Sequence, residues 1–453
     1  MTGSPNLSRR DVLKIGGGLA ATVGIGGSLA ACSGGNEFEY MFWGSTGEQD
    51  AIEAMLAGFQ DTQEDLTIKP VYTPADYDTK LNALVASGNV PDLGYVQPAM
   101  AYRLAEQGKL LDLAPHFDEY PSLGQRLPGS YFYWEEDKCL GTQGANETVI
   151  TFYNRAAFAE TGAQPPPASA AEAWDWDTYV ENAYLLTADQ SGRRPDEAGF
   201  DPTQVARFGT LASMWSGAWY GLLLSAGVDV VDSSGTRTML DSPEAIDMFQ
   251  KLVDLMYEHR VAPSPSQLGN NAPSMAVQLA SGRLGMAIDG QWALLDVSQA
   301  DFDFGVGVLP SLGTPKTTAM GGPTAIFADT EYVEQALELY AFQSDPDQVD
   351  LFSSGLWMPL EEKYYTDPEA IASWTDNDAH PPEYKTAVID YTLENSQTYF
   401  TQKLRNVEEI DRLITSTTER IQTGEEDVAT VMGELAAQLN DGMLQGVYPS
   451  APQ

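Results

Sequence analysis

Basic residues are scarce in this chain of 453 residues. Lysine and arginine number 24 against 65 aspartate and glutamate residues, which gives a formal net charge of −41. Nucleic-acid binding needs clustered lysine and arginine to contact phosphates, and the sequence has no such cluster. The same charge disfavours docking of the folded chain on an anionic membrane surface. We therefore expect no nucleic-acid partner and no electrostatic membrane binding.

Residue patterns that support common catalytic or metal chemistry are also missing. The three histidines, His116, His259 and His380, are far apart and have no metal-ligand spacing. Signatures of nucleophile elbows, zinc sites and P-loops are absent. A carbohydrate hydrolase would need two carboxylates roughly 5–10 Å apart, and 65 acidic residues supply such pairs by chance. We expect no catalytic residue, no metal ion and no cofactor, so that the chain is not an enzyme.

Cysteine is limited to Cys32 and Cys139. Cys32 ends the sequence Leu29-Ala30-Ala31-Cys32, which resembles a lipobox. Upstream, residues 8–14 (SRRDVLK) resemble a twin-arginine export signal, and residues 15–31 form an uncharged run too weakly apolar for a stable membrane span. Residues 1–31 are thus predicted to be a signal peptide. Residues 32–36 are predicted to be a flexible tether with lipid on Cys32, so that no intramolecular disulfide is available.

The mature chain is still more acidic than the full sequence. Residues 1–31 carry three basic residues and one acidic residue, so their removal takes the net charge from −41 to −43. Such a charge repels itself strongly in dilute salt, whereas about 1 M salt shortens the Debye length to roughly 3 Å. The composition is typical of organisms with an acidic proteome, and it predicts a protein that works in a salty or otherwise harsh exterior.

The length and the hydrophobic periodicity predict two α/β domains. A chain of 453 residues exceeds the size that one hydrophobic core usually supports. Strands and helices alternate in a way that favours a parallel sheet with helices on both faces. The predicted strands are residues 37–43, 66–72, 91–96, 147–154, 303–309 and 324–328. The predicted helices are residues 76–87, 99–107, 155–160, 176–186, 243–259, 407–421 and 427–439, with another after residue 47.

Residues 278–295 (QLASGRLGMAIDGQWALL) are the most informative stretch for function. They predict a helix that ends at Ser281-Gly282, a strand over residues 284–288, and Asp289 and Trp292 at the strand's exit. Open α/β sheets bind ligands outside the carboxyl ends of their strands. An indole face beside hydrogen-bonding groups suits a sugar, which has an apolar ring face and a polar rim. A purely structural Trp292 fits this stretch equally well by itself.

Five segments together resemble the sugar-binding, maltose-binding-protein-like lipoproteins of ABC importers. They occur in the family's order: residues 77–92 (Y-x-x-K…A-S-G-x-x-P-D), 147–155 (E…Y-N-R), 224–227 with 241–245, 279–292 (A-S-G-x-x-G-M-x-I-D-G-x-W), and 305–310 leading to 321–322. The resemblance implies a two-lobe periplasmic-binding-protein-like α/β fold of type II, with a hinge of several crossing strands. It places crossings near Glu147, Met320 and Ser344-Asp345. Lobe 1 would comprise residues 37–147 and 320–344, and lobe 2 residues 148–319 and 345–453.

The resemblance also supplies candidate ligand-binding residues. Glu147 matches a cleft carboxylate of the family, and Trp292 matches an aromatic that stacks on the sugar. In residues 95–97 the chain departs from the maltose binders, which argues against maltodextrin and makes Gln97 a replacement contact. Tyr399 and Phe400 match another stacking position loosely. The full set of candidates is Trp43, Gln97, Glu147, Trp215, Trp219, Asp289, Trp292, Gly321 and Gly322.

Alternatives remain for the ligand and for the class of protein. A polyamine or metal-chelate binder of the same fold would need several carboxylates framed by aromatics, in place of one acid with amides and aromatics. An exported carbohydrate hydrolase and a structural surface lipoprotein are the other candidates. The expected protein is a monomer on the extracellular face of the membrane, exported by the twin-arginine route, lipid-anchored, and delivering a sugar to ABC permease subunits.

Overall fold

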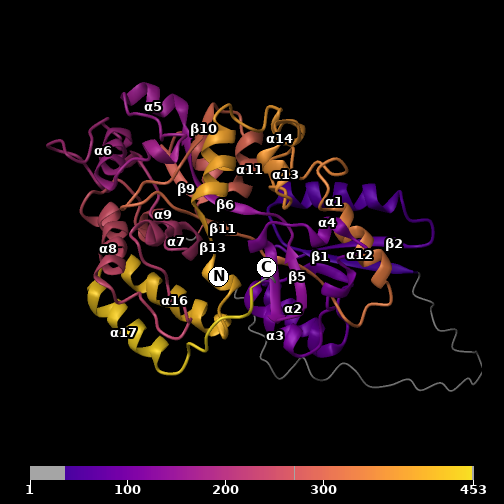
Figure 1. Ribbon diagram of the computed structural model, residues 1–453. Helices are drawn as coiled ribbons and strands as arrows, with labels where there is room; N and C mark the ends of the chain where they lie inside the picture. Colours follow the sequence, from indigo (N-terminus) through magenta and orange to yellow (C-terminus); the bar gives the residue numbers. More distant parts are fainter. Residues whose placement is uncertain (1–35, 270, 451–453) are drawn as a thin grey trace, which may run out of the picture. The chain divides into compact units, whose positions relative to one another are not determined.

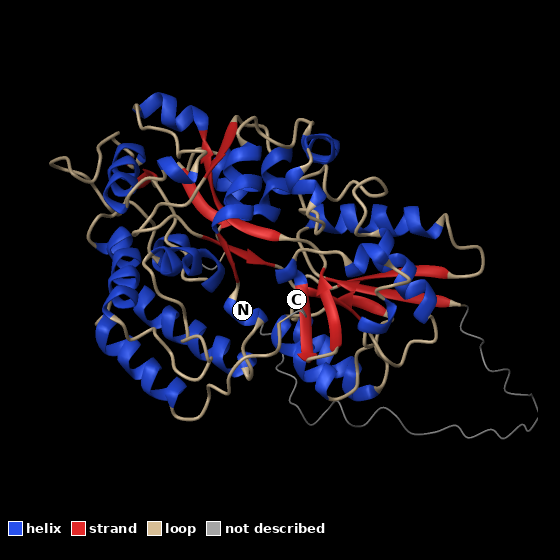
Figure 2. Ribbon diagram, in the orientation of Figure 1, coloured by secondary structure: helices blue, strands red, loops and turns tan. Residues whose placement is uncertain are grey.

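The computed structural model describes residues 36–269 and 271–450, and these form two mixed β-sheets with helices around them (Figures 1 and 2). The first sheet has the strand order β2-β1-β3-β12-β5-β4. Its strands are β1 (Glu37–Phe42), β2 (Thr67–Tyr72), β3 (Leu93–Tyr95), β4 (Tyr131–Glu135), β5 (Lys138–Gln143) and β12 (Pro323–Ile326). β1 is parallel to β2 and β3, whereas β12 is antiparallel to both β3 and β5. A late segment of the chain thus completes a sheet begun at its start.

The second sheet is built around β6 (Glu147–Asn154). β6 pairs antiparallel with β9 (Met286–Gly290), β10 (Phe304–Gly307) and β11 (Thr317–Met320). β11 pairs in turn, in parallel, with β13 (Ser396–Thr398). Two short strands, β7 (Ala188–Asp189) and β8 (Val205–Arg207), form a separate ladder. Because β6 has partners along its whole length, the position of its first residue, Glu147, is fixed by hydrogen bonds.

Helices from the first part of the chain begin and end at the residues that local chemistry favours. The Ser45 hydroxyl accepts from the Glu48 N–H at the start of α1 (Thr46–Gln60), and Asp175 and Ser242 cap α6 (Trp176–Leu186) and α8 (Pro243–Tyr257) in the same way. Further helices up to residue 299 are α2 (Tyr77–Ser87), α3 (Pro98–Glu106), α4 (Pro121–Gly124), α5 (Arg155–Thr161), α7 (Ser216–Ser225), α9 (Pro265–Leu268), α10 (Met275–Ala280) and α11 (Leu294–Gln299).

The last part of the chain is mainly helical. Its helices are α12 (Val333–Phe342), α13 (Lys363–Thr366), α14 (Pro368–Thr375), α15 (Tyr391–Asn395), α16 (Val407–Gln422) and α17 (Val428–Asn440). The short 3₁₀ helices are η1 (Ala114–His116), η2 (Pro128–Ser130), η3 (Ala170–Glu172), η4 (Gln291–Ala293) and η6 (Phe400–Gln402), and η5 (Lys385–Asp390) is a π-helix. None of the helices in the described residues is long and apolar enough to cross a membrane.

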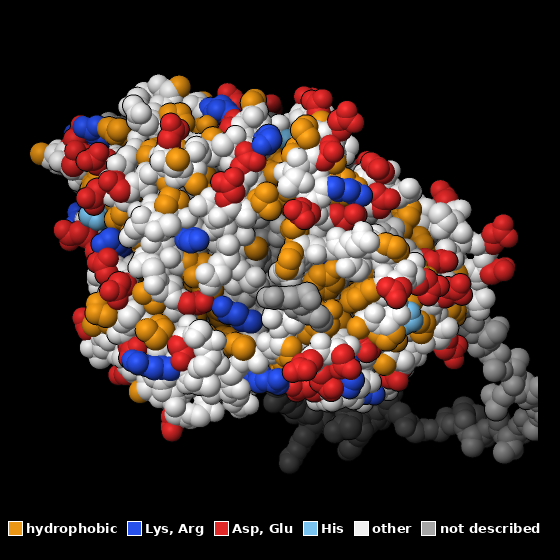
Figure 3. All heavy atoms as spheres, in the orientation of Figure 1, with side chains coloured by type: hydrophobic (Ala, Val, Ile, Leu, Met, Phe, Trp, Pro, Cys, Tyr) orange, Lys and Arg blue, Asp and Glu red, His pale blue; other side chains and the backbone are white. Residues whose placement is uncertain are grey.

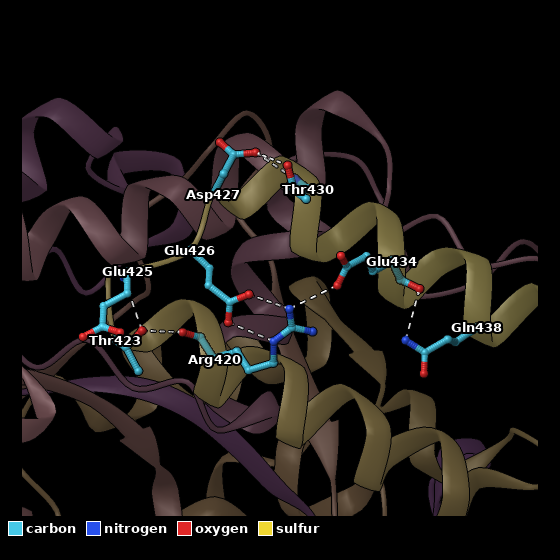
Figure 4. Close-up of polar contacts among 8 residues, drawn as sticks. All are labelled: Arg420, Thr423, Glu425, Glu426, Asp427, Thr430, Glu434 and Gln438. Atoms are coloured by element: carbon cyan, nitrogen blue, oxygen red, sulfur yellow. Dashed lines mark hydrogen bonds and ion pairs between the residues drawn. The ribbon is translucent and has the colours of Figure 1, made fainter.

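α16 and α17 lie side by side and are linked by one arginine (Figure 4). The Arg420 guanidinium donates to both carboxylate oxygens of Glu426, at 3.0 and 2.6 Å, and to Glu434 at 3.1 Å. Apolar residues of both helices are buried beneath this polar layer. Elsewhere acidic side chains spread over the visible surface, with lysine and arginine side chains between them (Figure 3).

Most of the predicted elements are confirmed. β6 and α6 have the predicted bounds, and the other predicted strands and helices are present with ends shifted by a few residues. The prediction of a parallel sheet is confirmed for β1, β2 and β3 and wrong for the other predicted strands, because β12 and the β4–β5 hairpin enter the first sheet antiparallel and β6 is antiparallel to three of its neighbours. The predicted export signal and the lipobox fall on residues 1–32, outside the described part of the chain, and the lobe boundaries stay a prediction.

Candidate functional site

A cavity of about 780 Å³ lies where strands from both sheets end. Trp43 follows β1, Tyr95 ends β3, and Trp292 follows β9, so the carboxyl ends of these strands face the same space. Six aromatic residues line the cavity: Trp43, Tyr95, Trp215, Trp292, Trp357 and Tyr399. The volume is typical of a site for a small molecule (about 300–1,000 Å³).

Trp43 is held by two tyrosines on the first-sheet side. Its ring packs edge-to-face on Tyr77, with centroids 4.8 Å apart, and on Tyr95, with centroids 4.9 Å apart. The Tyr77 hydroxyl donates to the Tyr95 carbonyl oxygen at 2.7 Å, which ties α2 to the end of β3. Gly322 lies against the same indole, since a β-carbon there would contact the ring at 3.6 Å. This wall is therefore a fixed aromatic surface.

Two further indoles meet on the second-sheet side. The rings of Trp215 and Trp292 are nearly perpendicular, at 79°, with centroids 5.7 Å apart. Trp215 is the N-cap residue of α7 and keeps 44% of its surface exposed. Its ring lies over Gly217, where a β-carbon would come within 2.2 Å of the indole. Gly217 is thus required for the observed orientation of Trp215.

Acidic side chains far outnumber basic ones in the cavity. Seven acidic residues and one basic residue, Arg412, are among the described residues that line it; the acids are Glu48, Asp78, Glu147, Asp289, Asp296, Glu408 and Asp411. Glu408 forms an ion pair with Arg103 at 3.4 Å, and Asp296 accepts a hydrogen bond from Ser45 at 3.2 Å. The remaining acids have no ion-pair partner among the described residues.

Glu48 and Glu147 are the two acids that burial affects most. Burial raises the pKa of Glu48 to about 8, against the effect of the Tyr95 hydroxyl, which lies 3.5 Å from its carboxylate. Burial also raises the pKa of Glu147 to about 8, and the nearby charge of Glu48 contributes to that rise. The charge of Glu48 therefore disfavours ionisation of Glu147, and both carboxyl groups release their protons at a higher pH than exposed ones do.

Two other acidic residues of the cavity, Asp289 and Asp411, are also largely buried. Burial raises the pKa of Asp289 to about 6, opposed by the Gly290 N–H, which donates to it at 2.8 Å. Asp411 has one carboxylate oxygen that is inaccessible to solvent and has no hydrogen-bond partner. Burial raises the pKa of Asp411, and a hydrogen bond with the Ser216 side chain opposes that rise.

The absence of a side chain at Gly44 leaves room for the Glu48 carboxylate. Gly44 has φ +145°, and a β-carbon there would come within 2.0 Å of the Glu48 carboxylate. The Tyr72 hydroxyl donates to the Gly44 carbonyl oxygen at 2.8 Å and holds the turn between β1 and α1. A side chain at Gly44 would displace Glu48 from its present position.

The structure brings most of the predicted site residues together. Eight of them line the cavity: Trp43, Gln97, Glu147, Trp215, Asp289, Trp292, Gly321 and Gly322. Trp219 does not line it. Its indole is fully buried between Phe249 and Phe400, and its N–H donates to the Met214 carbonyl oxygen at 3.1 Å. Every residue of α7 is buried, so its apolar sequence gave no indication of which side faces the cavity.

Several lining residues were not among the predicted ones. Glu48 and Asp296 lie in the first turns of helices that follow the strand ends, a position that the strand-exit argument could have included. Tyr95 is next to the predicted Gln97, and Tyr399 matched only loosely. Trp357 lies between α12 and α13, in a stretch for which the sequence predicts no strand or long helix, and no local signal places it here. Among the described residues, no group of three or more His, Cys, Asp and Glu side chains is placed to hold a metal ion.

Comparison with known proteins links this geometry to a family. Residues 54–382 match the family described as bacterial extracellular solute-binding protein. A search of curated proteins found no match. The three solved structures described next share no more than 20% sequence identity with the chain. At this identity the likeness shows the fold alone.

Solved structures cover nearly all of the described chain. An ABC substrate-binding protein, Lmo0181, from Listeria monocytogenes in complex with cycloalternan shares 20% identity at a TM-score of 0.76, over 90% of this chain and 98% of that chain. A solute-binding protein from Thermotoga lettingae with bound alpha-D-tagatose shares 16% identity at a TM-score of 0.74, over 90% of this chain and 100% of that chain. The GacH receptor of Streptomyces glaucescens, solved unliganded and with acarbose, shares 16% identity at a TM-score of 0.71, over 90% of this chain and 99% of that chain. These likenesses confirm the predicted two-lobe, periplasmic-binding-protein-like α/β fold.

Proposed function

We propose that this chain, which belongs to the bacterial extracellular solute-binding protein family, captures a sugar or oligosaccharide in its cavity and delivers it to the permease of an ABC importer. The observation that carries the proposal is the pair of aromatic walls, Trp43 with Tyr95 and Trp215 with Trp292, on either side of a polar cavity. The ligands named for the similar structures, cycloalternan and alpha-D-tagatose, are carbohydrates.

The number of contacts is sufficient for useful affinity. Micromolar binding corresponds to about −8 kcal/mol. An aromatic contact contributes about 0.5–1.5 kcal/mol beyond the area it buries, and a hydrogen bond about 1 kcal/mol net. Trp43, Trp215 and Trp292 can stack on a sugar, while Glu147 and Asp289 can accept from its hydroxyl groups. A handful of such contacts therefore offsets the free energy required to order the ligand and close the lobes.

The chain's organisation fits capture between lobes. β11 belongs to the second sheet and β12 to the first, and the two strands are separated by Gly321 and Gly322 at the cavity. We propose that the lobes comprise residues 37–147 with 320–344 and residues 148–319 with 345–453, and that they close on the ligand by bending where the chain crosses. A monomer with residues 32–36 as a tether then meets the permease at the membrane.

The amino-terminal sequence supports export and anchoring. The twin arginines at positions 9 and 10, the uncharged run and the lipobox ending at Cys32 occur in the required order. We propose export of the folded chain, cleavage before Cys32 and lipid attachment to its sulfur. A Cys32→Ala variant should accumulate without lipid and be released from membranes, which metabolic labelling with a radioactive fatty acid would detect.

No catalytic step is part of the proposal. The family and the similar structures are binding proteins. A cavity with several carboxylates is also what a hydrolase would have, so the absence of turnover is tested directly. Sugars incubated with the purified chain should be recovered intact by chromatography, and cleavage of any of them would refute a purely binding role.

The proposed function is tested by calorimetric titration of residues 33–453 with a panel of mono-, di- and oligosaccharides at high salt. At least one saccharide should bind, and Trp292→Ala should weaken its binding about tenfold or more while leaving the melting temperature nearly unchanged. The matched control is Trp134→Ala, which removes a half-buried indole of β4 that does not line the cavity. Equal loss in both variants, or no saccharide binding at all, would contradict the proposal.

A further inference from the structure

The charge of the cavity is more one-sided than a neutral ligand requires. Among its described lining residues, seven are acidic and only Arg412 is basic, and the single lining acid in an ion pair is Glu408. A carboxyl group can accept hydrogen bonds from the hydroxyl groups of a neutral sugar, but that contact leaves in place the free-energy cost of ionising two neighbouring buried carboxyl groups. A ligand that carries positive charge would remove it.

Two of these acids, Glu48 and Glu147, reach the cavity from the sides of different sheets. Glu48 comes from α1 on the first-sheet side, and Glu147 begins β6 of the second sheet. The Glu48 carboxylate accepts a hydrogen bond from the Tyr95 hydroxyl at 3.5 Å, and the Glu147 carboxylate has no hydrogen bond to any described residue. Both carboxylates line the cavity. They are therefore available to a ligand from two directions.

The aromatic walls define what kind of ligand can approach these acids. Tyr95 donates to Glu48 and packs against Trp43, and Trp292 follows Asp289 along the chain. Rings of this type stack on the apolar face of a sugar and also attract a cation through their π-electrons. The cavity of about 780 Å³ has room for a ring system as well as a charged group. The sequence alone left a sugar binder and a binder of cationic solutes as alternatives, and the cavity has features of both.

We propose that the ligand is an amino sugar, or an oligosaccharide of amino sugars, whose ammonium group lies between Glu48 and Glu147. The proposal rests on the proposed function, since it keeps a saccharide as the ligand and adds its charge. An ammonium group donates three hydrogen bonds, so it can be shared by both carboxylates while the ring stacks on an indole. Asp411 is a further acidic residue that lines the same cavity.

The test compares matched sugars that differ only in charge. Residues 33–453 are titrated calorimetrically with neutral saccharides, with the corresponding amino-deoxy sugars and with their N-acetyl derivatives, in about 1 M NaCl to screen the general attraction of an acidic protein for cations. At least one amino sugar should bind about tenfold or more tightly than its neutral and N-acetylated counterparts. Because the N-acetyl group keeps the bulk and removes the charge, this difference reports the ammonium group alone.

Variants assign the preference to the two carboxylates. Glu147→Gln and Glu48→Gln should each reduce the preference for the amino sugar to about twofold or less, because each replaces one of the two charged acceptors of the ammonium group. The control is Glu181→Gln, which removes one negative charge from an exposed position of α6 outside the cavity. This control variant should keep the full preference, because the substitution lies outside the cavity. Its overall charge equals that of the two cavity variants, so the comparison is matched.

The outcomes separate this inference from the proposed function. If neutral and amino sugars bind equally, the inference is refuted and the sugar-binding role stands. If spermidine binds and no saccharide does, the sugar-binding role is refuted as well, in favour of a polyamine binder. Absence of heat with every compound would refute both.

Discussion

The indole of Trp292 lies directly over the α-carbon of Gly290, so close that a β-carbon at Gly290 would come within 2.0 Å of its six-membered ring. Gly290 ends β9 and Trp292 lies in η4 immediately after it. The ring is therefore oriented by the absence of a side chain two residues before it. Its other neighbour, Trp215, approaches edge-on.

Gly290→Ala should displace the Trp292 ring and weaken ligand binding without unfolding the chain. The loss of one well-oriented aromatic contact corresponds to about 0.5–1.5 kcal/mol, or roughly 2- to 12-fold in the dissociation constant. Calorimetric titration with the tightest-binding saccharide measures it. Combining Gly290→Ala with Trp292→Ala should cost no more than Trp292→Ala alone, because both act through the same ring; additive losses would contradict this relationship.

Glu147→Gln should raise stability more at alkaline than at acidic pH. The pKa of Glu147 and that of Glu48 are raised by burial to about 8, so the folded chain holds protons that the unfolded chain releases above about pH 4.5. Stability from these groups is therefore present below pH 4.5 and is lost as pH rises toward 8. The increase in melting temperature caused by Glu147→Gln should be larger at pH 8.5 than at pH 5.5.

Glu181→Gln is the matched control for that pH series. It removes the same charge from an exposed site on α6, so its effect on the melting temperature should be small and similar at both pH values. An equal pH dependence in the two variants would show that general repulsion, and not the buried position of Glu147, is responsible.

Added salt should stabilise the folded chain. Residues 32–453 carry a net charge of −43, and acidic side chains are spread over the visible face in Figure 3. Raising NaCl from 0.1 to 1 M shortens the Debye length from about 10 to about 3 Å, which weakens repulsion between surface carboxylates. The melting temperature should rise through this range, and KCl should act like NaCl. A flat or falling melting temperature would argue against the predicted adaptation to a salty exterior.

Two glycine substitutions should change stability in opposite directions. Gly433 lies inside α17 and Gly282 follows α10, and a β-carbon at either would meet no atom within 4 Å. Gly433→Ala should stabilise the chain by about 0.5–1 kcal/mol, since alanine favours a helix interior. Gly282→Ala should destabilise it by about 1–2 kcal/mol, because Gly282 has φ +69°. Urea unfolding of the two variants measures both values.

Local patterns in the sequence predicted the elements well where one face is continuously apolar. The bounds of β6 and α6 followed from their hydrophobic patterns. The β4–β5 hairpin, β11 and β13 were not predicted, since short strands depend on partners that lie far away in the chain. The orientation of β12 is decided in the same way, by β3 and β5 on its two sides.

The site was predictable to the extent that it follows strand ends. Asp289 and Trp292 lie at the carboxyl end of a strand that the sequence marks, Glu147 was assigned through the family resemblance, and all three line the cavity. Trp357 and Asp411 reach it from segments with no such signal, because tertiary packing alone brings them there. Trp219 shows the converse, since a helix that is apolar on every side does not reveal in sequence which residues face the cavity.

The placement of the tryptophans gives the chain an internal optical probe. All nine lie in the part of the chain that the structure describes, and four of them, Trp43, Trp215, Trp292 and Trp357, line the cavity. Entry of a ligand would change the emission of these four, while the buried Trp219 and Trp374 would provide a constant background. Replacing the four one at a time with phenylalanine would show which wall a sugar touches, with no attached dye.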